Sequence, residues 1–134
     1  MNKKHLIVIS ISAAFAILIG CSLGAGSASI SNAQVTQGNC GALQNGQSCQ
    51  VTLTYNTGGE SSVTFGVTYT PAQPANQFTA AFGSCSMATG QQTCQVPVTY
   101  TRPATGRPVP QTLVFTLGTG ESAAKSTGIQ FAGQ

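Results

Sequence analysis

Apolar and polar residues alternate strictly along much of the chain from about Ile30 onward. Val, Leu, Phe and Tyr occupy every second position, and Thr, Ser, Gln and Asn fill most of the positions between them. A period of two over four or more residues predicts a β-strand with one buried face and one solvated face. Four long stretches and two short ones follow this rule: 50–56, 62–69, 95–101, 113–117, 78–82 and 129–131.

Turn signals, each a glycine next to a polar residue, lie before the first of these stretches and in most of the gaps between them. They are Asn45-Gly46, Thr57-Gly58-Gly59, Thr89-Gly90, Thr105-Gly106 and Thr119-Gly120. About seven short strands in about a hundred residues predict an all-β fold, and we expect an Ig-like antiparallel β-sandwich over residues 32–134. Pro97 lacks a backbone donor, so we expect its strand to lie at a sheet edge or to bulge there.

The chain also repeats itself. Cys85 and Cys94 lie 45 positions after Cys40 and Cys49, and each pair leads into the same pattern of Gln, Val and a strand that ends in Thr-Tyr. A unit of about 45 residues is too small to close a core, so we expect the two units to complete one sandwich. Two very small tandem domains are the alternative, in which each would bury little surface.

The first residues have the composition of an export signal. Lys3 and Lys4 precede a run, 6–19, that is apolar apart from two serines. Gly20 follows the run and precedes Cys21. The run is shorter than the about 20 apolar residues of a transmembrane helix, so we predict a cleaved signal peptide over residues 1–20. The alternative is an uncleaved anchor in which the cysteine is an ordinary thiol.

The tetrapeptide Leu18-Ile19-Gly20-Cys21 resembles the lipobox of bacterial lipoproteins. The resemblance implies cleavage before Cys21, a diacylglycerol on its thiol and an acyl chain on its amino group. Several acyl chains anchor a protein durably to a bilayer. The lipidated cysteine and a tether rich in Gly, Ala and Ser would occupy residues 21–31. Ser22 follows the cysteine where Asp would favour the inner membrane, so we expect a lipid anchor in the outer membrane, on its periplasmic face or at the cell surface.

A second resemblance lies in the repeated motif. Residues Cys40 to Tyr55 are similar to a strand-turn-strand signature of bacterial Ig-like domains of the hydin and choice-of-anchor type. The second copy, Cys85 to Tyr100, departs from it because Met87 or Ala88 replaces the leucine and a proline interrupts the strand. The resemblance covers about half of the chain after the signal. It implies a sandwich without catalytic residues that acts as an interaction module.

Few charges remain after the signal is removed. The formal charge of the precursor is +3, and the loss of two lysines leaves +1. The sequence contains no Asp and has no His beyond the signal, so it does not support a nucleic-acid partner. The remaining charged side chains are Arg102, Arg107, Lys125, Glu60 and Glu121.

This inventory is poor for catalysis. No His or Asp is present to activate a serine or threonine hydroxyl. Glu60 and Glu121 adjoin glycines in predicted turns, which favours solvated charges over a glycosidase-like pair. Arg102 and Arg107 lie in a proline-rich loop, where they are either solvated or in contact with an anionic headgroup or a glycan. We therefore expect no enzyme activity and no cofactor.

The tyrosines Tyr55, Tyr69 and Tyr100 follow the apolar phase of their strands, so we expect them in the core rather than stacked on a ligand.

The other four cysteines allow three pairings. We favour Cys40–Cys49 and Cys85–Cys94, because the repeat makes each pair local to its own unit; pairing across the units is the alternative. Each bridge would contribute about 2.5–3 kcal/mol in the chain-entropy model. The spacing does not suit zinc, no Cys-x-x-Cys is present, and an exported protein favours disulfides, so we expect no metal site.

The sequence thus predicts a membrane-anchored lipoprotein of the bacterial envelope that acts as a non-catalytic structural or protein-interaction module. Its polar strands carry few charges and suit pairing with a strand of another protein. One alternative is a module that binds a small ligand or glycan through the loops 70–77 and 101–110. Another is an accessory subunit of an envelope or secretion complex.

Overall fold

The computed structural model describes residues 27–59, 63–119 and 122–134. The predicted signal peptide, Cys21, Glu60 and Glu121 lie outside these ranges. The described residues form β1 (Ser29–Gln37), β2 (Ser48–Asn56), β3 (Thr64–Thr70), β4 (Phe78–Ala80), β5 (Gln91–Tyr100), β6 (Gln111–Gly118), β7 (Ala124–Lys125) and β8 (Ile129–Phe131).

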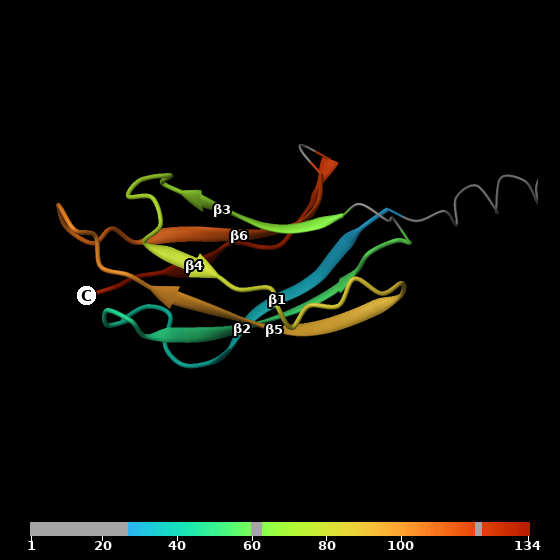
Figure 1. Cartoon of the computed structure of the whole chain (residues 1–134), viewed down its shortest axis with the longest axis horizontal. Helices are drawn as coiled ribbons and strands as arrows, with labels where there is room; N and C mark the ends of the chain where they lie inside the picture. Colours follow the sequence, from blue (N-terminus) through green and yellow to red (C-terminus); the bar gives the residue numbers. More distant parts are fainter. Residues whose placement is uncertain (1–26, 60–62, 120–121) are drawn as a thin grey trace, which may run out of the picture.

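The strands make two antiparallel sheets that face each other as two layers (Figure 1). The first sheet has the order β1-β2-β5-β4, and the second has the order β3-β6-β7, with β8 pairing β6 beside β7. The prediction of an all-β antiparallel fold is confirmed. The four long alternating stretches form β2, β3, β5 and β6, and the two short ones give β4 and β8.

The first strand, β1, lies in a segment for which the sequence pattern predicts no strand, and it begins before residue 32, the predicted start of the domain. Ser29 pairs with Asn56 and Ile30 pairs with Tyr55, so β1 takes up the last residues of the expected tether. Ile30 and Ala33 are half-buried against the core, whereas the other residues of β1 are exposed. Because β1 has few apolar residues and they do not alternate regularly, the period-two pattern does not predict this strand.

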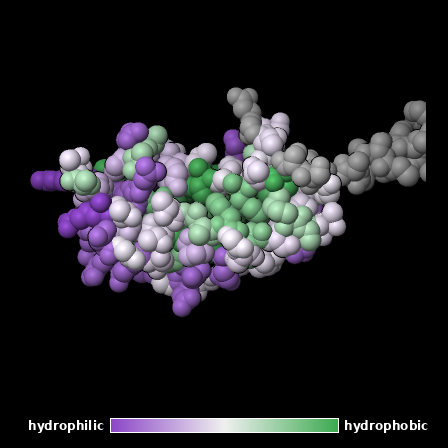
Figure 2. Space-filling view, in the orientation of Figure 1, coloured by the Kyte–Doolittle hydropathy of each residue, from purple (hydrophilic) through white to green (hydrophobic). Residues whose placement is uncertain are grey.

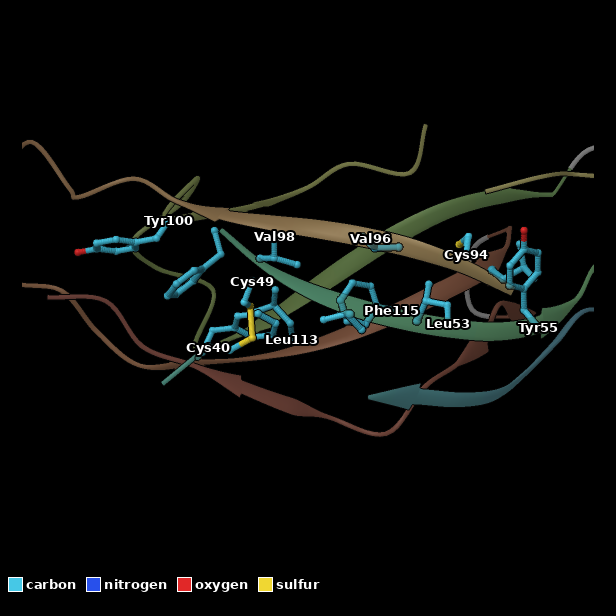
Figure 3. Close-up of a cluster of buried hydrophobic side chains, with 14 of the residues drawn as sticks. Cys40, Cys49, Leu53, Tyr55, Cys94, Val96, Val98, Tyr100, Leu113 and Phe115 are labelled. Carbon is cyan, nitrogen blue, oxygen red and sulfur yellow. A yellow bond between two sulfur atoms is a disulfide. The ribbon is translucent and has the colours of Figure 1, made fainter. Parts of the chain in front are cut away.

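Alternate residues of β2, β5 and β6 fill the core between the layers (Figure 3). Two aromatic clusters occupy its two ends. At one end the ring of Phe78 lies 5.4 Å from Tyr100 and 5.6 Å from Phe131. At the other end Phe65 lies 5.0 Å from Tyr55 and 5.2 Å from Phe82. Full burial of one such side chain contributes about 1.5–3 kcal/mol.

The strands of the repeated motif pair with each other at the centre of the first sheet. Val51 lies opposite Val96, which is its own counterpart 45 positions later, and Leu53 lies opposite Cys94. The two strands are thus related by an approximate two-fold axis through the Val51–Val96 pair. As a result the two cysteine pairs lie at opposite ends of the sheet, one beside Tyr100 and one beside Tyr55 (Figure 3).

Pro97 does not mark an edge, and that prediction is wrong. Its strand, β5, is an inner strand that pairs with β2 along its length and with β4 over three residues. The carbonyl of Pro97 accepts a hydrogen bond from the N–H of Ala81 at 3.1 Å, so this residue faces the β4 side just where the β4 ladder ends. The missing donor therefore falls at a position that needs none.

Candidate functional site

The cysteines pair as the repeat predicts. Cys40 is bonded to Cys49 with their Cα atoms 5.5 Å apart, and Cys85 is bonded to Cys94 with theirs 5.0 Å apart. Both bridges close loops with a sequence separation of 9 residues. The local pairing is confirmed, and no bridge joins the two repeats among these four cysteines.

The first cysteine loop is tied to the C-terminal segment. The N–H of Leu43 donates to the carbonyl of Ala132 at 3.0 Å, and the N–H of Ala132 donates to the carbonyl of Cys40 at 2.8 Å. Gln134 adds a third bond of 2.8 Å from its N–H to the carbonyl of Leu43. Leu43 and both cysteines are buried, so this loop forms part of the core.

The second cysteine loop rests on the sheet through side chains. Tyr55 donates its hydroxyl hydrogen bond to the carbonyl of Ser86 at 2.6 Å, and Thr57 donates to the carbonyl of Ala88 at 3.2 Å. Burial raises the pKa of Tyr55 above its usual value of 10.0. Met87, at the tip of the loop, is 43% exposed. The loop is therefore held in place but remains at the surface.

Two buried glutamines join the loops at the end where the C terminus lies. Gln77 donates from its side-chain amide to the carbonyl of Val109 at 2.6 Å and to the Oε1 atom of Gln111 at 3.1 Å. Gln111 donates in turn to the carbonyls of Pro71 and Pro74. The sequence analysis missed this network. The available signal was that Gln111 is a polar residue on the apolar phase of β6.

The network holds the loops 71–77 and 101–110 side by side. Arg102 and Arg107 are both exposed on the second of these loops, and the N–H of Arg102 donates to Asn45 Oδ1 at 2.8 Å. Tyr55 and Tyr100 are buried in the core as expected, and Tyr69 is half-buried on β3. The two glutamates, Glu60 and Glu121, lie outside the described residues.

A shallow groove runs between β1 and residues 125–127. Ile30 and Ala33 form its apolar wall, and Lys125 is the charged residue that lines it. Among the described residues that line the groove, Lys125 has the one ionisable side chain, so these residues supply no acid–base pair. Among residues 27–59, 63–119 and 122–134, no three His, Cys, Asp or Glu side chains converge to hold a metal ion. No helix within that part of the chain is both long and apolar enough to cross a membrane.

The outer edge of β3 is a more distinctive surface. β3 pairs with β6 on one side, in an unbroken register from Thr64–Gly118 to Thr70–Thr112. No other strand in the described part of the chain pairs with its opposite side. The edge therefore presents backbone donors and acceptors over seven residues.

The hydrogen bonds of β6 identify these free groups. Phe115 exchanges hydrogen bonds with Ser126, so its backbone groups point toward β7 and away from β3. Because backbone groups alternate along an antiparallel strand, Val114 points toward β3 and bonds its partner Thr68. The same alternation turns the backbone groups of Phe65, Val67 and Tyr69 outward to the free edge.

The side chains of these three residues are half-buried and face the core. Partial burial raises the pKa of Tyr69 above 10.0. Phe65 stacks on Phe82, which follows β4, so apolar side chains line the gap between the two layers on this side. Figure 2 shows an apolar surface here, between β3 and the chain after β4. The free edge and this surface together form the candidate binding site, which we call the β3 edge.

Comparison of the chain with protein-family models, with curated proteins and with solved structures found no match.

Proposed function

We propose that this chain is a lipid-anchored lipoprotein of the bacterial envelope that acts as a non-catalytic structural or protein-interaction module. Its described part is an Ig-like sandwich, and its binding surface is the β3 edge. The observation that carries the proposal is a regular edge strand of seven residues, Thr64–Thr70, without a partner strand in the described part of the chain and next to half-buried aromatic side chains. A row of free backbone groups beside apolar side chains suits strand addition.

The strand order supports the Ig-like assignment. In an immunoglobulin constant-type domain, strands A, B, E and D form one sheet, and strands C, F and G form the other. The orders β1-β2-β5-β4 and β3-β6-β7 correspond to these two sheets, and β8 extends the last position. The two repeats of about 45 residues would supply the first and second half of this arrangement.

The first and last described residues lie at opposite ends of the first sheet, which suits attachment through an N-terminal tether. The backbone of Ser27 lies against Gly58, whereas Gln134 bonds Leu43 at the opposite end of the first sheet. Gly58 has φ of 68°, and a Cβ there would come within 2.5 Å of the Ser27 backbone. A lipid on Cys21 would thus be tethered at the end of the sandwich opposite the loops 71–77 and 101–110 (Figure 1).

The anchor is tested by labelling the full chain with palmitate in a bacterial host. We expect label on the wild type and none on the Cys21→Ser variant, because the resemblance places the diacylglycerol on that thiol. The Cys21→Ser variant should also leave the membrane fraction or remain unprocessed. Labelling and detergent partition that survive the substitution would refute the lipoprotein assignment.

The binding surface is tested by affinity capture of the full chain from native membranes. Val67→Pro removes an outward donor at the β3 edge and leaves the ladder to β6 intact. Val35→Pro is the matched control, because Val35 lies on the other long edge strand, β1, and is 39% exposed. We expect the first variant to lose its partner and the second to keep it, with unchanged circular dichroism for both. Equal capture by the two variants would refute the proposal. A stoichiometric partner from a larger assembly would identify the chain as an accessory subunit.

A second candidate function is recognition of a small ligand or glycan by the loops 71–77 and 101–110. The observation in its favour is that Arg102 and Arg107 are exposed on loops that Gln77 and Gln111 fix together. Binding to a glycan array that is lost in the Arg102→Gln and Arg107→Gln double variant and kept by Val67→Pro would favour it over the β3 edge.

A further inference from the structure

The edges of the two sheets differ in how they are protected from other strands. β1 carries two irregularities, at Ser31 and at Thr36, where its register with β2 shifts. β4 and β8 have three residues each and β7 has two. Bulges and short strands are common means of preventing pairing between edges. β3 has neither, and it contains no proline and no charged residue. It is therefore the edge most open to an added strand.

The sequence of β3 is also complementary to itself. It reads Thr-Phe-Gly-Val-Thr-Tyr-Thr, and Val67 is its central residue. Counting outward from Val67, a threonine ends the strand on each side and an aromatic residue lies two positions away on each side. An antiparallel copy of this strand would thus meet matching residue types at the edge positions.

We propose that the β3 edge binds the β3 edge of a second copy of this chain, with Val67 opposite Val67 across a two-fold axis. This rests on the proposed function and names the partner at the same surface. Two-fold symmetry brings the same surface of each copy together, so one self-complementary edge is sufficient. The pairing joins the second sheets of the two copies into one continuous sheet.

The backbone permits this register. The outward groups belong to Phe65, Val67 and Tyr69, which are the positions that pair when Val67 is central. Phe65 of each copy meets Tyr69 of the other, and each such hydrogen-bonded pair exchanges two bonds, which gives about six in all. In a register shifted by one residue, the outward backbone groups of one copy would lie opposite residues of the other copy whose backbone groups point toward β6, so these hydrogen bonds could not form.

The side chains fit as well. Phe65 and Tyr69 form aromatic pairs across the strands, and Thr64 meets Thr70 on the outer face; both kinds of pair stabilise neighbouring strands. Because β3 is uncharged, the contact brings no like charges together. The second copy would also cover the half-buried row beside Phe82.

The proposed membrane anchor would favour this contact. One strand pair buries less than the about 1,000 Å² typical of stable interfaces, so the dimer is weak at low concentration in solution. Confinement to a bilayer raises the effective concentration of the second copy. Antiparallel pairing places the two tethers at opposite ends of the dimer, so its strands lie along the membrane. The eight residues from Cys21 to Ala28 reach at most about 27 Å, which allows both lipids to insert.

Oxidative cross-linking of the full chain in bacterial membranes tests the inference. In the proposed register, the two copies of residue 67 have Cα atoms about 5.5 Å apart, which a disulfide can span. The two copies of residue 64 are six positions out of line, or about 20 Å apart. We expect Val67→Cys to give at least about tenfold more disulfide-linked dimer on non-reducing gels than Thr64→Cys, the matched control at the end of the same strand.

Other outcomes separate this inference from the proposed function. Equal cross-linking of the two variants, or no dimer with either, would overturn self-pairing through β3. If a different protein is then captured by the wild type and lost in Val67→Pro, the proposed function stands and only the identity of the partner is wrong. If Val67→Pro changes neither the dimer nor the capture, both proposals fail.

Discussion

The two cysteine loops begin from one sequence motif and end in different environments. The loop from Cys40 to Cys49 is covered by the C-terminal segment, and its Leu43 is 3% exposed. The loop from Cys85 to Cys94 has no such cover in the described part of the chain, and Met87 at its tip is 43% exposed. The motif therefore determines the covalent connection, and the chain that lies across the loop determines whether it is part of the core or part of the surface.

The largest difference is expected when each bridge is removed. We predict that Cys40→Ala with Cys49→Ala lowers the free energy of unfolding by about 4–5 kcal/mol, because the lost loop also supports the C-terminal segment. Cys85→Ala with Cys94→Ala should cost only about 2–3 kcal/mol. Urea unfolding of both variants, purified in parallel, measures the difference. A larger loss for the second pair would contradict the comparison.

Single residues at the loop tips sharpen the same contrast. Leu43→Ala should lower stability by about 2–4 kcal/mol, because it opens a cavity under the C-terminal segment. Met87→Ala should change it by no more than about 0.5 kcal/mol, because the side chain is largely solvated. Thermal and urea unfolding of the two variants provide the test, and similar losses would show that the two loops are packed alike.

The main strands and the cysteine pairing are predictable from sequence, whereas the position of each strand within its sheet is not. Alternation identified β2, β3, β5 and β6, and the repeat identified both cysteine pairs, because these signals are local. The edge position of β3 and the inner position of β5 depend on which strands pair across the fold, which no local pattern encodes. Pro97 illustrates the limit: its missing donor is compatible with an inner strand because β4 ends beside it.

The glutamine network tests the end of the molecule that holds the first loop. Gln111→Ala should lower stability by about 1–3 kcal/mol, because it removes the donor to the carbonyls of Pro71 and Pro74 and one of the two acceptors of the Gln77 amide. Gln92→Ala, near the start of β5, is a control in which a smaller loss is expected, because its side-chain amide is half-buried and donates one bond of 3.3 Å to the carbonyl of Thr89. Unfolding experiments measure both variants. Equal losses would show that the network adds nothing specific to this end.

The smallest effect concerns two tyrosines: Tyr55 beside the second loop, and Tyr69, which lies toward the opposite end of β3, next to the glutamine network. Burial raises the pKa of both above 10.0, so the folded state retains their protons more strongly than the unfolded state does. Their contribution is fully present below about pH 10 and is lost as the pH rises beyond it. Urea unfolding at about pH 8 and pH 11 should show this decline, and it should be smaller for Tyr69→Phe. An unchanged decline in that variant would exclude Tyr69 as a source.

Backbone amide exchange in the membrane tests the central claim, binding through the β3 edge, most directly. Hydrogen exchange of the full chain is compared between native membranes and dilute detergent solution, for the segments 63–70 and 29–37. If a strand is added at β3, amides in 63–70 exchange at least about tenfold more slowly in the membrane, whereas those of β1 exchange at the same rate in both. Equal rates for 63–70 in the two conditions, or protection confined to β1, would contradict the account.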